Sequence, residues 1–517
     1  MSGGLNRRGL LAAGLSLLTG PAMAAAPNGA GEARLSLSGG APLSLVPADF
    51  TGFSVETVQL QDPTFYHPDN HSLIALHRRL TSRGVLRIGG NSSEFCWWRA
   101  TPDQPPPPLS APGVGQSGNW MPQHFNPITP AAVDALRGFL DACGWTCIWG
   151  LNFGTGSPDR DAEEAAYVAQ ALGPRLAYFQ IGNEPDLYRN ANNQLRPPGW
   201  DFPNYLDEWA ALAQAVIARV PQARFAGPDI GGGSDWVVRF AQQAPARIGD
   251  RLVGLSAHYY AEGPPESPNA DIAHLLAPDP RVAASLASVV PAAGAAGLTH
   301  RMTEVNSCYR GGKPGVSNAL AAALWGGDYM LRQAASGCAG VNFHGGPGAQ
   351  IAASNGDKMP GARSEADMAL ARLGTFYSPF AGSLTVGFSA RPLFYGMMLA
   401  QQFAGRRMVT CAFDAGGANA SAYVAERDGG WLAAAFNKTA DRDLSVRLDL
   451  PGVRRAQVWR LTGPALDATT DIRLAGREVA AGDADWAPSS VETLTGAEDG
   501  LRLDLPRASA ALVFIER

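Results

Sequence analysis

The feature of this sequence that most constrains its fold is a regular alternation of short apolar segments with longer amphipathic segments. The apolar segments have the length and the β-branched and aromatic content of buried strands. The segments between them carry apolar residues at helical spacing, as in Leu73, Leu76 and Leu80. Eight such strand–helix units follow one another, which favours a closed (β/α)8 TIM barrel over an open sheet. The chain is therefore predicted to be an α/β protein.

The predicted strands place their carboxyl ends at one mouth of this barrel, where TIM barrels carry their active sites. Two long segments rich in proline and glycine, 102–118 and 262–269, follow the second and sixth strands and are expected to flank a cleft there. The eight predicted strands cover residues 50–56, 85–91, 145–152, 176–181, 223–229, 252–260, 298–304 and 340–344.

The pattern changes after the predicted barrel. Segments such as 445–450 and 501–505 alternate strictly between apolar and polar residues, which is typical of half-buried antiparallel strands. We predict a catalytic barrel over 49–405 and a C-terminal β-sandwich domain over 406–517. A further strand within 27–48 has no helix after it, so it is expected to join the sandwich.

The N-terminus has the pattern of an export signal. Arg7 and Arg8 precede an apolar run, and residues 22–24 offer a small-x-small cleavage site. The paired arginines resemble a twin-arginine signal. The apolar run is shorter than the about 20 residues that a membrane-spanning helix needs, and no later segment is predicted to span a membrane. We predict a cleaved signal peptide over 1–26 and a periplasmic or secreted bacterial protein.

The composition argues against several classes of function. The formal net charge of −5 gives the chain no general affinity for nucleic acid or for an anionic membrane. There is no CxxC motif, no HExxH motif and no histidine cluster with metal-ligand spacing, so no metal and no other cofactor is predicted. Cys143 and Cys147 either form a disulfide or remain buried thiols. The sequence leaves the oligomeric state open.

Two glutamates at predicted strand ends are the candidate catalytic residues. Glu184 follows the fourth strand between a glycine and a proline that fix its direction, and Glu304 ends the seventh strand. Glycoside hydrolysis uses two such carboxyl groups, one protonated and one ionised, which lie about 5–5.5 Å apart in retaining enzymes. Asn183 is placed to hold the sugar 2-hydroxyl. The plainer alternative is that Glu184 only caps a turn, but the second acidic strand end favours catalysis.

Three motifs in these regions resemble glycoside hydrolase family 79, which contains heparanases and bacterial β-glucuronidases. They are Leu-Arg-Ile-Gly-Gly-Asn at 86–91, Asn-Glu-Pro-Asp at 183–186, and Glu-Val-Asn-Ser-Cys-Tyr at 304–309 with glycines at 311–312. Asn-Glu-Pro alone recurs across a large clan of barrel glycosidases, but its combination with the 304–309 motif is specific. The resemblance covers nearly all of the mature chain, including residues 391–396 and the β-rich end.

This resemblance implies a retaining, exo-acting β-glucuronidase whose partner is a carbohydrate bearing glucuronic acid. Glu184 would be the acid/base and Glu304 the nucleophile. Tyr309 and the backbone of Gly311 would face the substrate carboxylate. The resemblance implies further substrate contacts from Glu56, Asn91, Asn183, Tyr259 or Tyr260, and Tyr377.

Arg310 departs from the family pattern, because it interrupts a glycine run that the animal enzymes have. Arginine binds carboxylates through two parallel hydrogen bonds. Arg310 therefore either contributes to the selection of a uronate or points to solvent, and the sequence does not decide between these alternatives.

Two other functions compete with this hypothesis. Endo-cleavage of an acidic polysaccharide, as in the heparanases, needs an open cleft with basic walls, which the net charge of −5 and the scarcity of lysine disfavour. A non-catalytic carbohydrate-binding protein has no use for two carboxylates that are costly to bury at strand ends.

Overall fold

The computed structural model describes residues 31–39, 43–108, 122, 124–190, 194–359, 361–482, 486–496 and 500–517. The predicted signal peptide 1–26 and residues 109–118 of the first predicted loop lie outside the described residues. Within these described ranges, no helix combines the length and the apolar character needed to cross a membrane.

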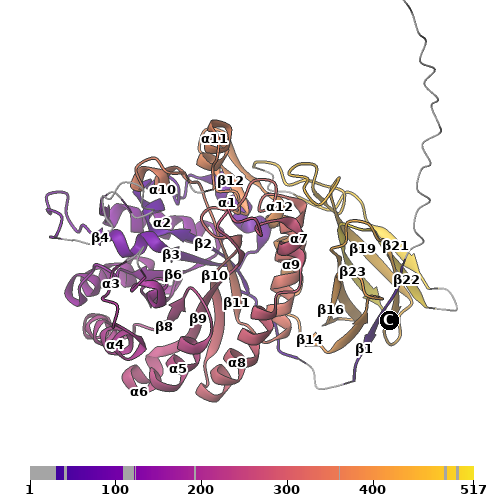
Figure 1. Cartoon of the computed structure of the whole chain (residues 1–517), viewed down its shortest axis with the longest axis horizontal. Coiled ribbons are helices and arrows are strands. Elements are labelled where there is room, and N and C mark those ends of the chain that lie inside the picture. Colours follow the sequence, from indigo (N-terminus) through magenta and orange to yellow (C-terminus); the bar gives the residue numbers. More distant parts are fainter. Residues whose placement is uncertain are drawn as a thin grey trace, which may run out of the picture.

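Eight parallel strands close into a barrel, as predicted (Figure 1). Each barrel strand pairs with the barrel strands that precede and follow it in the chain. The eighth closes the circle by pairing with the first, where Val341 lies opposite Thr51. In order around the barrel, the strands are β2 (Thr51–Glu56), β3 (Val85–Gly89), β6 (Thr146–Leu151), β7 (Leu176–Ile181), β8 (Phe225–Ile230), β9 (Leu252–Glu262), β10 (Thr299–Cys308) and β11 (Gly340–His344).

Helices surround the barrel, and their ends follow the expected local signals. The helix α2 (Pro130–Cys143) begins with a proline at its first position. It ends at Gly144, which adopts the left-handed conformation that terminates helices. The helix α4 (Phe202–Arg219) begins with a capping box between Asp201 and Asn204. The larger helices are α1 (His71–Leu80), α2 (Pro130–Cys143), α3 (Pro158–Leu172), α4 (Phe202–Arg219), α5 (Asp235–Gln243), α8 (Pro280–Ala296), α9 (Leu320–Ala335), α11 (Glu365–Leu373) and α12 (Pro392–Gln401).

All six cysteines are free, and Cys143 and Cys147 are buried thiols.

Short elements in the loops complete the barrel domain. The short elements used below are η1 (Thr57–Gln61), η2 (Asn91–Phe95), η4 (Pro185–Leu187) and α10 (Ala349–Ser354); the others are β4 (Cys96–Trp98), β5 (Asn126–Ile128), η3 (Gly173–Arg175), α6 (Pro245–Ile248), η5 (Gly249–Arg251), α7 (Ile272–Leu276), β12 (Phe380–Ser383) and β13 (Gly387–Ala390).

The C-terminal part forms a β-sandwich, as predicted. One sheet has the order β15-β1-β18-β22, and the other has the order β14-β16-β17-β23-β19-β20 with β21 beside β19. Apolar side chains from both sheets, including Val446 and Val513, form one buried core between them. The strands are β14 (Met408–Val409), β15 (Cys411–Asp414), β16 (Ala420–Arg427), β17 (Gly430–Asn437), β18 (Leu444–Asp449), β19 (Arg455–Thr462), β20 (Arg473–Leu474), β21 (Glu492–Thr495), β22 (Leu501–Leu505) and β23 (Ser509–Glu516).

The N-terminal strand β1 (Gly31–Leu37) lies in the sandwich rather than in the barrel (Figure 1). It pairs with β18 in parallel and with β15 in antiparallel orientation. Its apolar residues Ala33 and Leu35 are buried in the sandwich core, while Arg34 between them is exposed. The strict alternation seen in the sequence thus corresponds to one buried and one solvated face.

The barrel and the sandwich meet at α9 through a partly buried polar cluster. Asp328 of α9 accepts hydrogen bonds from Ser421 Oγ at 2.6 Å and Tyr423 Oη at 2.7 Å, and its Oδ2 lies 2.5 Å from Lys438 Nζ. The side chains of Lys438 and Asp328 are 10% and 17% exposed. The pair therefore connects the two parts of the molecule in a largely water-free environment.

Lys438→Met is expected to lower the free energy of unfolding by about 3 kcal/mol, because it leaves a buried carboxylate without its cation. Urea unfolding at neutral pH measures this change. Arg502→Met is the matched control, since Arg502 pairs with Glu32 at the surface and such pairs contribute about 0.5 kcal/mol or less. Equal losses of unfolding free energy in the two variants would contradict the larger contribution expected from the Lys438–Asp328 pair.

Candidate active site

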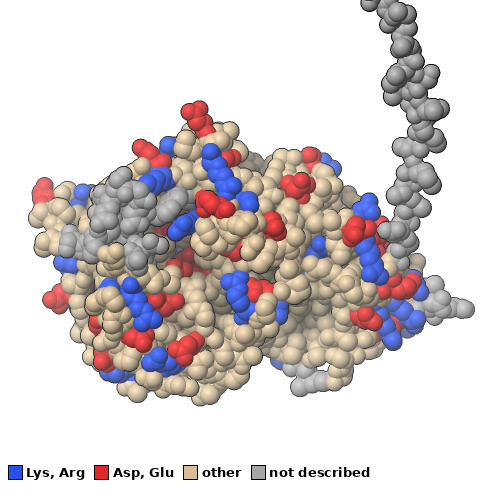
Figure 2. All heavy atoms as spheres, viewed as in Figure 1, with Lys and Arg blue, Asp and Glu red and all other residues tan. Residues whose placement is uncertain are grey.

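The carboxyl ends of the barrel strands surround a cavity of about 850 Å³. Figure 2 shows acidic side chains in a hollow of the surface over the barrel. All residues predicted to catalyse or to contact substrate line this one cavity: Glu56, Asn91, Asn183, Glu184, Tyr259, Tyr260, Glu304, Tyr309, Arg310, Gly311 and Tyr377.

Glu184 sits on a tight turn directly after β7. Its backbone is left-handed, with φ 50° and ψ 51°, which costs a non-glycine residue on the order of 1 kcal/mol or more. Two backbone hydrogen bonds hold this conformation: the Glu184 amide donates to the carbonyl of Asp229 at 2.9 Å, and the Leu187 amide donates to the carbonyl of Glu184 at 2.9 Å. The turn thereby directs the Glu184 side chain into the cavity.

Glu304 lies within β10, which continues to Cys308, so the prediction that the seventh strand ends at Glu304 is wrong. The pairing of β10 with β9 shifts register between Met302 and Glu304. Such an irregularity re-aims side chains, and here two consecutive residues face the barrel interior: Thr303 donates to Asp229, and Glu304 contacts Arg87. The register shift therefore brings a carboxylate inward at a position that strict alternation would not provide.

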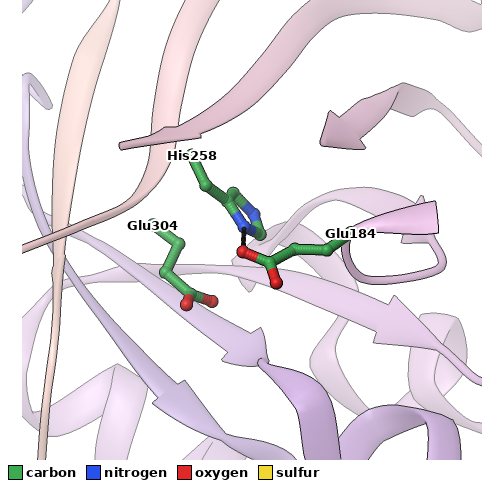
Figure 3. Close-up of side chains that lie close together, drawn as sticks. All are labelled: Glu184, His258 and Glu304. Atoms are coloured by element: carbon green, nitrogen blue, oxygen red, sulfur yellow. Dashed lines mark hydrogen bonds and ion pairs between the residues drawn. The ribbon is translucent and has the colours of Figure 1, made fainter. Parts of the chain in front are cut away.

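The two glutamates point toward each other from opposite walls of the cavity, with His258 beside them (Figure 3). One carboxylate oxygen of Glu184, one of Glu304 and one ring nitrogen of His258 all lie within 4.8 Å of one another. Glu304 is 5% exposed, and the Glu184 side chain is 14% exposed. A single small group placed between the carboxylates can therefore contact both.

Arg87 of β3 is the centre of the hydrogen-bond network beneath the two glutamates. Its side chain is 1% exposed. Sequence reasoning did not select it, although one charged residue inside an otherwise apolar strand was the signal that could have found it. Its guanidinium donates to Gln180 Oε1 at 2.9 Å, Ser54 Oγ at 3.1 Å, Glu304 Oε2 at 2.6 Å, Asn183 Oδ1 at 2.7 Å and Asp229 Oδ2 at 2.6 Å.

His258 of β9 connects Glu184 to Asp229, and neither His258 nor Asp229 was among the predicted site residues. Its Nδ1 lies 3.1 Å from Glu184 Oε1, and its Nε2 lies 3.2 Å from Asp229 Oδ1. Burial alone would lower the pKa of His258, but the carboxylates of Asp229 and Glu304 raise it to about 10. His258 is therefore a cation at neutral pH, whose Nδ1 hydrogen-bonds Glu184 and whose Nε2 forms an ion pair with Asp229.

Glu304 is held in its ionised form. Burial alone would raise its pKa, but His344, His258 and Arg87 carry positive charges nearby and lower the pKa to about 2. Tyr260 donates its hydroxyl to Glu304 Oε1 at 2.7 Å, while Arg87 bonds the other oxygen. A buried carboxylate that is charged and fixed through both oxygens has the properties of a nucleophile or of a charge-stabilising group.

Glu184, His258 and Glu304 are close enough together to hold a metal ion, but their other contacts do not suit one. Arg87 already bonds Glu304 at 2.6 Å, and His258 carries a proton at neutral pH because of its raised pKa. A cation at this point would face two positive groups instead of a neutral imidazole ligand.

Polar residues at the ends of the first and second barrel strands form another part of the cavity wall. The Asn183 amide group donates to Asn91 Oδ1 at 3.1 Å. Glu56 accepts two hydrogen bonds from Ser92, from its amide at 2.8 Å and its hydroxyl at 2.6 Å. His344, which was also not predicted, lies 3.5 Å from Glu56 Oε1. This wall offers several amide and carboxylate groups that can hydrogen-bond sugar hydroxyls.

The two adjacent tyrosines of β9 differ in orientation. The Tyr260 ring lies beside Tyr309 and Tyr377, with ring centroids 6.2 Å from each. Tyr259 lines the cavity, but its hydroxyl donates to Asp279 at 2.7 Å and its ring stacks on Tyr329 at 5.1 Å. Of the two alternatives, the geometry therefore favours Tyr260 as the residue that contacts the reacting centre.

The turn after β10 brings Tyr309, Arg310 and Gly311 to the rim. Tyr309 is 38% exposed, and Arg310 is exposed with a left-handed backbone, φ 62°. Gly311 is buried, and its carbonyl accepts the Tyr377 amide at 3.3 Å. The segment before α12 is thereby tied to this turn, which brings Tyr377 to the cavity.

Glu94, in η2, is a buried carboxyl group that sequence reasoning missed. It is 2% exposed. Its Oε1 accepts the backbone N–H of Asn183 at 2.5 Å, and its Oε2 accepts the N–H of Gly154. It therefore joins the loops that follow β3, β6 and β7 directly beneath the Glu184 turn. Burial raises the pKa of Glu94 to about 7, although hydrogen bonds from Tyr188, Gly154 and Asn183 favour the ionised form.

The stability of Glu94→Gln relative to the wild type is expected to depend on pH. The native protein keeps the Glu94 proton up to about pH 7, whereas the unfolded chain releases it near pH 4.3. Wild-type stability therefore falls as pH rises through this window, by about 3 kcal/mol for this group, and the variant lacks this contribution. Urea unfolding of both proteins at several pH values between 4 and 8 measures it. A stability difference that stays constant over this range would contradict the assignment.

The chain is similar in sequence to two fungal proteins named β-glucuronidase. No protein-family model matches the chain. A β-glucuronidase of Aspergillus niger is 26% identical over 364 residues, which cover 64% of this chain and 66% of that protein. A β-glucuronidase of Neurospora crassa is 25% identical over 360 residues, which cover 62% of each chain. The chain thus matches a little under two thirds of the length of these relatives.

Solved structures of glycosidases share the fold. The 4-O-α-L-rhamnosyl-β-D-glucuronidase of Fusarium oxysporum superposes with a TM-score of 0.69 at 16% identity, covering 93% of this chain and 99% of that one. The family 51 arabinofuranosidase of Xanthomonas axonopodis has a TM-score of 0.61 at 14% identity, covering 94% and 100%. The chain is therefore glycoside hydrolase-like in sequence and in fold, while its membership of family 79 remains a prediction.

Proposed function

We propose that the protein is a retaining glycoside hydrolase that removes terminal β-linked glucuronic acid. The observation that carries the proposal is the pair of Glu184 and Glu304 oxygens within 4.8 Å of each other in one cavity. Retaining glycosidases hold their carboxyl groups about 5–5.5 Å apart, whereas inverting enzymes leave about 6.5–9.5 Å for a water molecule. The approach of one oxygen of each carboxylate to within 4.8 Å supports double displacement.

In the first step, Glu304 attacks the anomeric carbon while Glu184 donates its proton to the departing glycosidic oxygen. In the second step, Glu184 takes a proton from water, and the water oxygen displaces Glu304 from the sugar. The low pKa of Glu304 supports its role as nucleophile. His258, 3.1 Å from Glu184 Oε1, stabilises the carboxylate that Glu184 becomes after it gives up its proton.

We assign uronate selection to the rim formed by Tyr309, Gly311 and Tyr377, with Tyr260 beneath it. Hydroxyl and backbone N–H groups there can donate to the C6 carboxylate. The similarity to two fungal proteins named β-glucuronidase supports the assignment. Arg310 lies next to this rim and is exposed, where its guanidinium can reach a substrate carboxylate from the solvent side.

Contacts between elements beside the cavity support exo action. The short strand β5 meets α10 in a side-chain hydrogen bond of 2.9 Å, from Asn126 Nδ2 to Ser354 Oγ. α10 also packs against η1 on this side of the cavity. An endo-acting enzyme needs a cleft that a polymer can cross, so the link between β5 and α10 favours a terminal sugar.

A panel of aryl β-glycosides that differ only at C6 tests the proposal. The glucuronide is expected to be hydrolysed at least about 100-fold faster than the glucoside, because the hydrogen-bond donors of the rim pair with the carboxylate and remain unpaired with a hydroxymethyl group. Binding of both compounds without turnover would instead support a carbohydrate-binding protein. Release of oligosaccharides rather than glucuronic acid from an acidic polymer would support endo cleavage.

Azide is expected to restore turnover to Glu184→Ala on an aryl glucuronide with a good leaving group. Such a substrate forms the glycosyl-enzyme without acid assistance, and azide then replaces the water that Glu184 no longer activates. The product should be the β-glucuronyl azide, which NMR identifies. An α-azide from this variant would mean that Glu184 is the nucleophile and Glu304 the acid/base.

A further inference from the structure

We propose that the cavity beside Glu184 is a leaving-group subsite for a bulky, uncharged, apolar aglycone, and that the consecutive glycines 231–233 form its floor. This inference rests on the proposed function, because it takes Glu184 as the group that protonates the departing oxygen. Atoms on the Glu184 side of the scissile bond then belong to the leaving group, and atoms on the Glu304 side belong to the sugar.

The glycine segment directly follows β8 and abuts the acid/base. A Cβ atom added at Gly231 would lie 2.8 Å from Glu184 Cδ and 3.0 Å from Leu187 Cδ1. The carboxylate of Asp186 fixes the segment by accepting the amides of Gly231 at 2.9 Å and Gly232 at 3.2 Å. The same turn that presents Glu184 thus also positions the glycines.

The next two glycines leave space instead of filling it. A Cβ atom added at Gly232 or at Gly233 would meet no described atom within 4 Å. Both residues are exposed and line the cavity. Gly233 needs its left-handed φ of 72°, whereas Gly232 is not in that region. The floor next to Glu184 is therefore made of backbone, and a broad group can lie flat on it.

Apolar side chains from neighbouring elements line the same cavity. Leu187 lies beside Glu184, and Val282 and Leu286 come from α8. The helix is joined to the end of the glycine segment by a hydrogen bond of 2.8 Å from Ser288 Oγ to Ser234 Oγ. Burial of apolar surface on such residues contributes about 25 cal/mol per Å², which favours an aglycone with extended apolar area.

The charges on this side do not suit an acidic polymer. Arg281 is the only positively charged residue among the described residues of the glycine segment and of α8 that line the cavity. Its guanidinium lies 2.6 Å from the Asp279 carboxylate and also donates to the carbonyl of Ala261 at 2.5 Å. Because Arg281 is already neutralised, a sulfated or uronate-bearing leaving group finds no cation here to offset its desolvation.

Two substrates with the same sugar test the subsite. 4-Methylumbelliferyl β-glucuronide fills it with a flat apolar group, whereas β-glucuronyl fluoride leaves it empty. Gly232→Leu is expected to lower the ratio of kcat/KM for the aryl glucuronide to kcat/KM for the fluoride by about 10-fold or more. Gly294→Leu is the matched control, because a Cβ atom there also meets open space but the residue lies outside the cavity, and it should leave both values unchanged.

Equal losses on both substrates, or no change in the ratio, would overturn the subsite while leaving the glucuronidase intact. Failure of the wild type to hydrolyse either compound would overturn the proposed function itself. Inhibition adds a test of charge: free 4-methylumbelliferone should inhibit the wild type more strongly than a sulfated oligosaccharide does. The opposite order would contradict an uncharged aglycone.

Discussion

Glu304→Gln is expected to lose hydrolysis of an aryl β-glucuronide, with kcat lower by on the order of 10⁴-fold or more. The amide has the same shape but no charge and no nucleophilic oxygen, so the covalent intermediate cannot form. The effect should persist from pH 5 to pH 8, because the pKa of about 2 keeps Glu304 ionised over this whole range in the wild type. Steady-state kinetics with a fluorogenic glucuronide measures it.

Glu262→Gln is the matched control for this variant. Glu262 lies at the end of the neighbouring strand β9 and is 7% exposed, but its carboxylate faces Asp271, whose amide it accepts at 3.2 Å. It should retain kcat within a few-fold. Substantial activity in Glu304→Gln, or similar losses in both variants, would remove the basis for a nucleophile on β10.

Arg87→Met is expected to lower the free energy of unfolding by about 3–5 kcal/mol at pH 7 and to abolish activity. The change leaves Asp229 and Glu304 buried without the guanidinium that bonds both at 2.6 Å, and such uncompensated charges are strongly destabilising. Arg87→Lys should restore part of the stability, because it returns the charge without the planar set of donors. Denaturant unfolding, followed by both fluorescence and circular dichroism, measures the change.

The deficit of Arg87→Met should shrink at low pH. Arg87 holds the pKa of Asp229 below its ordinary value against the opposing effect of burial. A carboxyl group with a lowered folded pKa stabilises the protein above its unfolded pKa, near 3.9, and this contribution disappears as pH falls through the folded value. At acid pH the wild type therefore loses the stabilisation that the ionised Asp229 gains from Arg87, which the variant lacks at every pH. A deficit below about 1 kcal/mol at pH 7 would contradict the central place of Arg87 in the network.

The barrel, the sandwich and the two glutamates could be predicted because their signals are local. Each strand–helix unit has its own periodicity, as Leu73 and Leu76 show in α1, and eight units in succession leave few alternatives for the fold. Glu184 stands between Gly182 and Pro185, which mark a turn at a strand end in the sequence itself.

The network beneath the glutamates could not be predicted, because it depends on which inward-facing positions of different strands meet. Arg87, Asp229 and His258 come from β3, β8 and β9 and touch only once the barrel is closed. The direction of Glu304 depends on a register shift in β10, which leaves no mark on the apolar pattern. Glu94 resembles an ordinary acidic residue in a short helix, and its burial and its contacts with Asn183 and Gly154 arise only in the folded protein.

The most direct test of the central claim is covalent trapping with 2-deoxy-2-fluoro-β-glucuronyl fluoride. Fluorine at C2 slows hydrolysis of the glycosyl-enzyme more than its formation, so a retaining enzyme accumulates the intermediate. Mass spectrometry of the digested protein is predicted to find one glucuronyl group on the peptide containing Glu304, and none in Glu304→Gln. An enzyme that hydrolyses aryl glucuronides but gains no label, or carries it on Glu184, would contradict the account.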